Sequence, residues 1–532
     1  MRSCIPVLVV GAGPSGLTLA IELIRRGIDC RIVDKAPELF TGSRGKGLQP
    51  RSLEVFEDLG VLDAVLAGGA PFPAFRMYSG HTILWERGLD EMLGTQPLER
   101  TSDVPYPRPW LIPQWRTDQI LHDRFAELGG RVELATELTG FTQDGAGVVS
   151  TLRHVDRQEQ VRADYLVGAD GGRSFVRKHT GIAFAGETYD SERTLIGDVR
   201  ATGLEGTFCH LFTSGDLTKR FSLWNLPRSD YYQFVTAVGA NDEPDLNLTA
   251  VQALLEERSG RTDIRLHDLN WISLYRVNVR MTERFRIGRV FLTGDAAHVH
   301  SSASGQGLNT SVQDAYNLGW KLAAVLDGAS DSLLDTYQDE RLPVAAEVLE
   351  VSTTMHHRGF RATTAPHGSA PAIHQLDITY RDSPLAVDDR PNPGQLRAGD
   401  RAPDAPLHTY SGTPIRLFGI LRGPRWTLLG FGTEVTDLAR RHGTSLRAYS
   451  VVQPGERGDL VDTHSQAARS YFVARSTYVL IRPDGYIGLI THDPRRVTEY
   501  LNRFLCGAGT SPDGVIESMR CSPGAATSQP WC

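Results

Sequence analysis

The sequence predicts an α/β protein with a doubly wound parallel sheet, an inserted antiparallel sheet and a smaller α/β domain towards its C-terminal end. Three observations support this fold class. Apolar strands run into turns of small residues at 7–16, 165–174 and 290–298. The first turn opens a helix that leads to a second strand, which is a βαβ unit. Residues 184–280 alternate in polarity and are rich in aromatics, which is typical of antiparallel strands.

The length and composition of the chain limit its class. Its 532 residues are too many for one hydrophobic core and predict two or three domains. Apolar residues make up 40% and charged residues 22%, as in ordinary globular proteins. The net charge of -7 offers no footprint for nucleic acid or for an anionic membrane, so neither partner is expected.

Targeting signals and cysteines point to the cytoplasm. No apolar run reaches membrane length, and the apolar N-terminal run lacks the cationic lead of a secretory signal. Six cysteines are scattered along the chain and none forms a C-x-x-C pair. This spacing predicts neither a zinc site nor a redox dithiol, so no metal is expected and a reduced, cytoplasmic protein is the plain interpretation.

The first domain opens with the βαβ unit, in which Gly27 ends the helix. A loop rich in Gly and Ser leads to the next helix, and a cluster of prolines at 100–113 predicts an irregular connection. The expected elements are strands at 4–10 and 30–34, helices at 16–26, 50–59 and 117–128, and short strands with a hairpin at 131–167.

The remaining segments complete the predicted domain organisation. Long helices are expected at 308–326 and 332–356, and strands near 426–430, 446–452 and 477–481. The domains are then residues 1–183 and 281–360 for the two parts of the first domain, 184–280 for the antiparallel sheet, 361–394 for a linker, 395–506 for the small α/β domain, and 507–532 for a disordered tail rich in Gly, Ser, Pro and Ala.

The first turn has the pattern of a dinucleotide site. Gly11, Gly13 and Gly16 form G-x-G-x-x-G between a strand and a helix, where backbone N–H groups can approach a pyrophosphate. Asp34 ends the second strand, where its carboxylate can accept hydrogen bonds from a ribose. Further cofactor-binding positions predicted beside these are Pro14, Ser15 and Lys35.

A second carboxylate, on a later strand, favours FAD over NAD. Gly294 and Asp295 follow the strand at 290–293, and a carboxylate there suits the ribityl chain of a flavin. A helix then opens with the predicted cofactor-binding residues Gly305, Gly307, Leu308 and Asn309, and its positive end would face the charge of the reduced ring. A structural helix start remains the alternative. Asp170, in the middle turn, is either a cofactor-site residue or an ordinary turn aspartate.

These motifs, together with Ser43-Arg44-Gly45-Lys46-Gly47-Leu48, resemble the class A flavin-dependent aromatic monooxygenases, the family of para-hydroxybenzoate hydroxylase. The chain is most similar to the polyketide and antibiotic branch, which includes rifampicin monooxygenase and aklavinone hydroxylases. The resemblance is strong over residues 5–350. It implies an FAD-binding domain, a substrate domain at 184–280 and a thioredoxin-like C-terminal domain that lacks the redox cysteines.

The resemblance also implies the chemistry. In this family FAD is bound, NADPH donates the hydride, and one oxygen atom of O₂ reaches an aromatic substrate through a flavin C4a-hydroperoxide. The expected substrate is a polycyclic aromatic or polyketide from secondary metabolism. The protein is expected to be a monomer or a homodimer, and no catalytic triad is expected. By resemblance, Arg44 lies beside the flavin and Gln114 faces its phosphate–ribityl part. Leu138 is a further predicted cofactor contact.

One departure from the family keeps other reactions open. The family's Pro-Pro turn is replaced here by residues 299–304, Val-His-Ser-Ser-Ala-Ser, which restores backbone donors beside the oxygen site. Baeyer–Villiger insertion, epoxidation and a flavin-dependent dehydrogenase therefore stay as alternatives, as does a silent flavin-binding scaffold that docks partners. The C-terminal domain is expected to be dispensable for flavin binding.

Two histidines and six aromatics complete the predicted site. His298 belongs to the shared motif and is interpreted as structural, whereas His300 is a weaker candidate for acid–base catalysis. Aromatic residues of the antiparallel sheet are candidates for lining the substrate pocket, with a core position as the alternative for each. They are Phe212, Phe221, Trp224, Tyr232, Phe234 and Tyr275.

Overall fold

The computed structural model describes residues 4–206, 208–216, 219–301, 305–358, 373–473 and 476–505. Its first sheet contains five parallel strands in the order β8, β2, β1, β11 and β18, with β17 antiparallel at one edge and the β9–β10 hairpin paired to β11. These strands are β1 (Cys4–Val10), β2 (Cys30–Val33), β8 (Val132–Glu133), β9 (Glu137–Asp144), β10 (Gly147–Arg153), β11 (Gln158–Gly168), β17 (Arg286–Ile287) and β18 (Val290–Leu292).

The strand order explains why distant segments meet. β11 pairs with β1 on one side and with β18 on the other, and all three run parallel. Parallel strands place their carboxyl ends at the same edge of a sheet. The three predicted turns follow these strands directly, so the fold brings them together.

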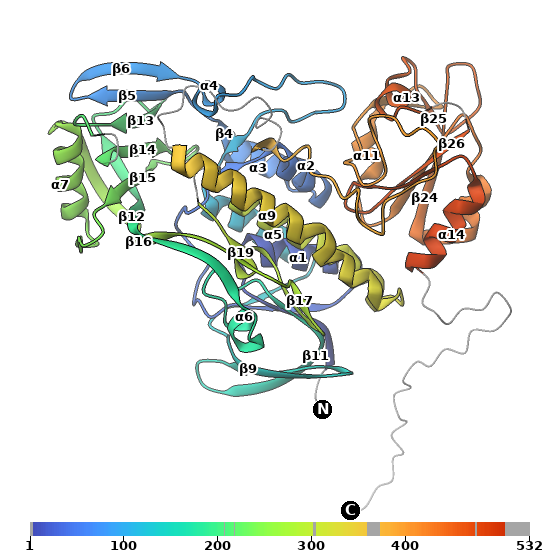
Figure 1. Ribbon diagram of the computed structural model, residues 1–532, viewed down its shortest axis with the longest axis horizontal. Coiled ribbons are helices and arrows are strands. Elements are labelled where there is room, and N and C mark those ends of the chain that lie inside the picture. Colours follow the sequence, from blue (N-terminus) through green and yellow to red (C-terminus); the bar gives the residue numbers. More distant parts are fainter. Residues whose placement is uncertain are drawn as a thin grey trace, which may run out of the picture.

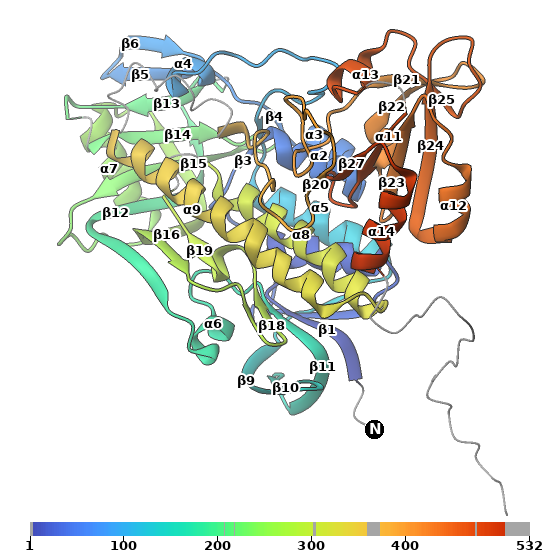
Figure 2. The same ribbon diagram turned by 45° about the vertical axis from the view of Figure 1, so that its right-hand side comes forward.

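Helices cover the sheet and begin close to where the sequence predicts them (Figures 1 and 2). The first helix starts at Pro14, because proline suits the first helical position. The helix expected at 332–356 is a short 3₁₀ turn, η4, followed by α9, which contains Pro343. The helices of this domain are α1 (Pro14–Ile24), α2 (Pro50–Leu59), α3 (Leu62–Gly68), α5 (Gln114–Glu127), α6 (Phe175–Thr180), η2 (Gly294–Ala296), α8 (Gly307–Leu326), η4 (Asp331–Leu334) and α9 (Asp335–Arg358).

The second sheet is larger than the segment at 184–280. Its order is β19-β16-β12-β15-β14-β13-β5-β6, and α7 packs on its outer side (Figure 1). β5 and β6 come from the first 100 residues, and β19 comes from the third turn. The elements are β5 (Phe75–Ser79), β6 (Thr82–Arg87), β12 (Phe184–Thr202), β13 (Cys209–Phe212), β14 (Phe221–Asn225), β15 (Tyr231–Val238), α7 (Leu248–Ser259), β16 (Arg265–Thr282) and β19 (His298–Val299).

The first domain also holds a small three-stranded sheet and a short helix near β6. The sheet order is β3-β7-β4, and it ties the 47–48 segment to the proline-rich connection. These elements are β3 (Gly47–Leu48), β4 (Ala70–Pro71), α4 (Leu89–Leu93) and β7 (Trp110–Leu111).

The C-terminal domain is built on a third sheet, of order β20-β27-β26-β23-β24-β25-β21-β22. The strands predicted near 426–430, 446–452 and 477–481 are confirmed as β23, β24 and β26. The elements are β20 (Val387–Asp388), β21 (Pro406–Thr409), β22 (Pro414–Arg416), α11 (Leu417–Leu421), β23 (Trp426–Phe431), α12 (Thr436–His442), η6 (Gly443–Ser445), β24 (Leu446–Val452), β25 (Leu460–Val461), α13 (Gln466–Ser470), β26 (Thr477–Ile481), β27 (Ile487–Thr491) and α14 (Pro494–Leu505).

The segment expected as a linker is folded wherever the structure describes it. Residues 361–372 lie outside the described residues, and so does the tail expected to be disordered at 507–532. Within 373–394, Tyr380 and Leu385 are buried, and β20 pairs with β27 of the third sheet. Proline and aspartate made this segment look like a spacer, but its apolar residues are packed.

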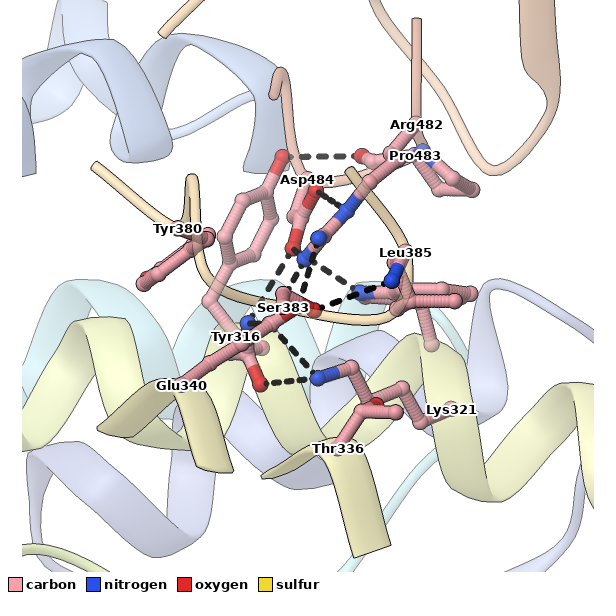
Figure 3. A network of polar contacts seen from close by, with 12 residues as sticks. Tyr316, Lys321, Thr336, Glu340, Tyr380, Ser383, Leu385, Arg482, Pro483 and Asp484 are labelled. Atoms are coloured by element: carbon pink, nitrogen blue, oxygen red, sulfur yellow. Dashed lines mark hydrogen bonds and ion pairs between the residues drawn. The ribbon is translucent and has the colours of Figure 1, made fainter. Parts of the chain in front are cut away.

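A buried polar network joins the C-terminal domain to the first domain (Figure 3). Arg482, in the turn between β26 and β27, donates to both carboxylate oxygens of Glu340 on α9, at 2.7 and 2.8 Å. Lys321 of α8 donates to the same carboxylate at 2.7 Å. Asp484 accepts from Trp320 of α8 at 3.0 Å. These charged side chains are at most 1% exposed, so the network belongs to the interior.

Candidate functional site

The three turns contact one another at the carboxyl edge of the first sheet. Ala169 donates its backbone N–H to Val10 at 2.8 Å, and Thr293 donates to Gly168 at 3.0 Å. The hydroxyls of Ser15 and Thr293 lie 3.2 Å apart. Gly11 has φ +107, and a Cβ atom there would lie 2.3 Å from the Ala169 carbonyl oxygen. Glycine is therefore required for the first and second turns to approach so closely.

The start of α1 is free to receive an anion. Its N-cap residue is Gly13, and no side chain caps the helix. A Cβ atom at Gly13 would meet nothing within 4 Å, whereas one at Gly16 would lie 1.9 Å from the Gly11 carbonyl oxygen. Gly16 thus packs the turn, and Gly13 leaves open space before the helix. Open space and unsatisfied N–H groups at a helix start fit a pyrophosphate.

Two carboxylates stand at the ends of this edge. Asp34 accepts backbone N–H groups from Ala12 and Ala36, both at 2.8 Å, which fixes its orientation. Asp295 is exposed, and one of its oxygens lies 3.5 Å from the Ser311 hydroxyl. Both carboxylates keep capacity to accept hydrogen bonds from sugar hydroxyls.

Two of the predicted cofactor contacts near Asp34 differ in their surroundings. Lys35 is exposed next to Asp34. Leu138 is only 3% exposed and packs in the core of the first domain, which speaks against direct contact with a nucleotide. It lies on β9, where Leu138 and Phe141 are the buried residues.

The start of α8 is held against the Arg44 loop, residues 43–48. No side chain caps α8. The Asn309 amide accepts from the backbone of Gln49 at 2.7 Å and donates to Gly47 and Gly305, both at 2.9 Å. Gln114 accepts from the backbone of Gly45 at 2.9 Å. Asn309 and Gln114 therefore position this loop through their side chains.

Arg44 projects from that loop towards the second sheet. Its guanidinium lies 5.5 Å from the ring of Phe40 and 5.8 Å from the ring of Trp271 on β16. The side chain is exposed, so its charge is available to a ligand between the loop and the sheet.

His298 is part of a buried polar network, in agreement with its structural interpretation. Its Nε2 lies 2.7 Å from Asp314 of α8, which also accepts from Arg341 at 2.7 Å and from the backbone of Gly294 at 3.3 Å. Burial would raise the pKa of Asp314, but Arg341 and His298 outweigh it and hold the pKa below its usual range. Asp314 thereby fixes the Gly294–Asp295 turn.

His300 lies against the first residue of α8. A Cβ atom at Gly307 would be 3.2 Å from its Nε2. The Nδ1 atom donates to the Ser301 carbonyl at 2.9 Å, and Nε2 has no hydrogen-bond partner among the described residues. Desolvation lowers the pKa of the ring, which favours a neutral imidazole with Nε2 as an acceptor.

Asp170 has a clear local role in the middle turn. Its carboxylate accepts from the backbone of Phe175 at 2.7 Å and of Val176 at 3.1 Å, at the start of α6. From that helix Arg177 donates to Gly172 at 2.7 Å and to Ala296 at 2.8 Å. Asp170 therefore builds the helix that ties the second turn to the third.

The six candidate pocket aromatics fall on two faces of the second sheet. Trp224 faces the Arg44 loop, and Tyr275 lies on the same strand face as Trp271. The other four contradict the prediction, because they are buried in the core that the sheet forms with α7. They are Phe212, Phe221, Tyr232 and Phe234.

Sequence reasoning missed a polar cluster on the inner face of this sheet. It consists of Lys46, Asp198 on β12 and Gln233 on β15. The Lys46 amine donates to the Gln233 side chain and lies 4.0 Å from the ring centre of Trp224. Asp198, a charged residue inside the apolar stretch Leu195–Val199, could have revealed this cluster, because a buried aspartate is rare unless it is paired.

The arrangement suits a long, anionic cofactor. In the part of the chain that the structure covers, no cluster of His, Cys, Asp and Glu could hold a metal ion. None of the described helices is both long and apolar enough to span a bilayer. Two uncapped helix starts and two carboxylates along one sheet edge match the pyrophosphate, ribose and ribityl parts of FAD.

The chain matches proteins of one kind over nearly its whole length. Residues 4–352 match the family model of an FAD binding domain, and residues 395–508 match that of the aromatic-ring hydroxylase C-terminal domain. A flavin-dependent monooxygenase of Mycobacteroides abscessus is 56% identical over 498 residues, which are 93% of this chain and 99% of that protein.

Solved structures agree with this match. Aklavinone-11 hydroxylase in complex with FAD and aklavinone has a TM-score of 0.79 at 29% identity, covering 95% of this chain and 100% of that one. An anhydrotetracycline hydroxylase from Streptomyces rimosus has a TM-score of 0.75 at 28% identity, covering 94% and 99%.

Proposed function

Because the chain belongs to the FAD-binding aromatic-ring hydroxylases and is a flavin-dependent monooxygenase, we propose that it uses NADPH and O₂ to hydroxylate a polycyclic aromatic polyketide. The observation that carries this proposal is the meeting of three turns, two exposed or half-exposed carboxylates and two uncapped helix starts at one sheet edge. The relatives with known ligands support the substrate class, since one binds aklavinone and another is named for anhydrotetracycline.

In this proposal FAD lies along the carboxyl edge of the first sheet. The start of α1 binds its pyrophosphate, and Asp34 accepts hydrogen bonds from its ribose. Asp295 accepts from the ribityl hydroxyls, and the start of α8 faces the ring. When bound, FAD supplies the hydride acceptor and the O₂-activating group.

The second sheet supplies the substrate side. The Arg44 loop lies between α8 and this sheet, so a flat aromatic ligand between them would contact the flavin ring on one side. Trp224 and Tyr275 face this space from β14 and β16. Exclusion of water from this space would favour oxygen transfer to the substrate over unproductive consumption of NADPH.

The test is oxygen transfer by the purified holoenzyme. Aklavinone or anhydrotetracycline should accelerate NADPH oxidation with matched O₂ uptake, and the product should carry one oxygen atom from labelled O₂. Carbon connectivity by nuclear magnetic resonance distinguishes a hydroxyl group from an inserted ring oxygen or an epoxide. Substrate-dependent NADPH oxidation without O₂ uptake, without hydrogen peroxide and without labelled oxygen in the product would identify a flavin-dependent reductase and refute the proposal.

A further inference from the structure

The second sheet carries a buried acid that interacts electrostatically with the amine of Lys46. Asp198 is fully buried on β12, and its carboxylate lies beside Ser43 of the Arg44 loop. The hydroxyl and backbone N–H of Ser43 lower the pKa of this carboxyl, but burial raises it more. A buried carboxylate with few partners is costly, so such a group marks a place where a proton or a ligand completes the structure.

Lys46 reaches into the same place from the loop. Its backbone is next to Gly47, whose carbonyl accepts from Asn309 at the start of α8. Its side chain crosses to the second sheet, where the amine contacts Gln233 and the face of Trp224. Gln233 in turn donates to the Ser43 carbonyl. Lys46 therefore spans the interval between the flavin end of α8 and the inner face of the sheet.

Resting on the proposed function, we propose that Lys46 binds and deprotonates an acidic hydroxyl group of the aromatic substrate, with Asp198 and Gln233 as positioning residues. The substrate O–H bond breaks, its electron pair stays on oxygen, and an N–H bond forms on Nζ. The resulting ion pair places a phenolate or enolate against the amine. The negative charge raises the electron density of the ring, which favours attack on an electrophilic oxygen atom.

The protonation of the cluster suits this role. Burial lowers the pKa of Lys46 to about 8, and burial raises the pKa of Asp198 to about 7. Cys209 on β13 also faces Lys46, and burial raises the pKa of this thiol to about 12. The thiol thus stays neutral, and the amine gives up its proton closer to neutral pH than an exposed lysine does.

The test uses the oxidised holoenzyme without NADPH, so that no turnover occurs. Anhydrotetracycline and aklavinone are the probes, and their absorption spectra report the ionisation of their hydroxyl groups while bound. In the wild type, the bound probe should ionise at least one pH unit below the free probe, which is about a tenfold effect. Lys46→Met and Lys46→Gln should lose this shift while retaining flavin.

Two further variants separate binding from structure. Gln233→Leu removes the contact that positions Lys46 but keeps the amine, so the ionisation shift should become smaller without being lost. Lys178→Met, an exposed lysine on α6, is the matched control and should behave like the wild type. Lys46→Gln guards against misfolding of Lys46→Met, because glutamine can still hydrogen-bond to Gln233.

The outcomes distinguish this inference from the proposed function. If the wild type hydroxylates a probe and both Lys46 variants retain the shifted ionisation, the role of Lys46 is refuted and the function stands. If the wild type neither binds nor oxidises either probe, the proposed function fails, and this inference fails with it.

Discussion

Asp295 is the residue whose substitution we expect to affect retention of the cofactor most. Its carboxylate is solvent-accessible and is the predicted acceptor for the ribityl hydroxyls. We expect Asp295→Ala to fold but to lose FAD on gel filtration, which the ratio of flavin to protein absorbance measures. Asp437→Ala, in exposed α12, is the matched control. Full flavin occupancy in Asp295→Ala would remove this residue from the site.

Asp314 is expected to matter for stability rather than for chemistry. Its removal leaves Arg341 as a buried cation without its carboxylate, which costs about 3–5 kcal/mol in comparable buried pairs. Asp314→Asn should therefore lower the free energy of unfolding by that amount in urea titrations. A change below about 1 kcal/mol would contradict the pairing.

The direction of the Asp314 pKa shift determines how the stability from this pair depends on pH. The folded state holds the pKa of Asp314 below the unfolded value, so its contribution is complete above the usual carboxylate range. The contribution is lost as the pH falls through the folded pKa. Wild type and Asp314→Asn should therefore converge in stability on acidification below about pH 4.

At the residue scale, glycines and motif acids were predictable, and the faces of aromatics were not. Gly11 and Asp34 are dictated by local geometry that any sequence of this pattern shares. Phe234 and its neighbour Gln233 differ by one position, which puts one in the core and the other against the Arg44 loop. Alternate residues of a strand point to opposite faces of the sheet. The sequence does not reveal which set of alternate residues faces the site, because both faces of this sheet are covered.

At the scale of elements, α1 and α8 meet at one glycine. A Cβ atom at Gly319 would lie 2.5 Å from the Cβ atom of Glu22 on α1. We expect Gly319→Ala to destabilise the protein by about 1–3 kcal/mol through overpacking, despite the better helix propensity of alanine. Thermal unfolding of the holoenzyme measures the effect.

Gly419 provides the matched control for that change. It lies in α11, where a Cβ atom would meet nothing within 4 Å. Gly419→Ala should be neutral or slightly stabilising, because alanine restricts the unfolded chain. Equal effects of the two substitutions would show that α1 and α8 do not pack as closely as described.

Element types were more predictable than element partners. The apolar residues of β23, β24 and α8 predict these elements from the sequence, and most residues of each are buried in the structure. The hairpin of β5 and β6 could not be assigned to the second sheet, because it joins that sheet through the parallel pairing of β5 with β13, whose residues lie more than a hundred positions away. β20, only two residues long, carries no period at all.

At the scale of the whole molecule, the C-terminal domain shares its core with the flavin-binding domain. Trp320 and Leu333 of the first domain pack with Trp426, Leu480 and other residues of the third sheet. Removal of residues 395–532 would expose this surface and leave Glu340 and Lys321 without Arg482. We therefore expect the truncated protein to aggregate or to lose flavin, contrary to the expectation from sequence alone.

A full-length variant separates the charge from the domain. Arg482→Met keeps the third sheet but removes one of the two cations that pair with Glu340 among the described residues, and it should destabilise the holoenzyme by about 3–5 kcal/mol. Differential scanning calorimetry on the holoenzyme measures this. A soluble truncated protein that retains stoichiometric flavin would contradict the shared core.

The Arg482–Glu340 pair also constrains the order in which the protein can fold during its synthesis. Glu340 leaves the ribosome about 140 residues before its partner, a delay of about 7–28 s at ordinary rates of synthesis. During that interval Glu340 has been synthesised, but the arginine that pairs with it has not. The interior shared by the two domains is therefore completed late, after Arg482 has been synthesised.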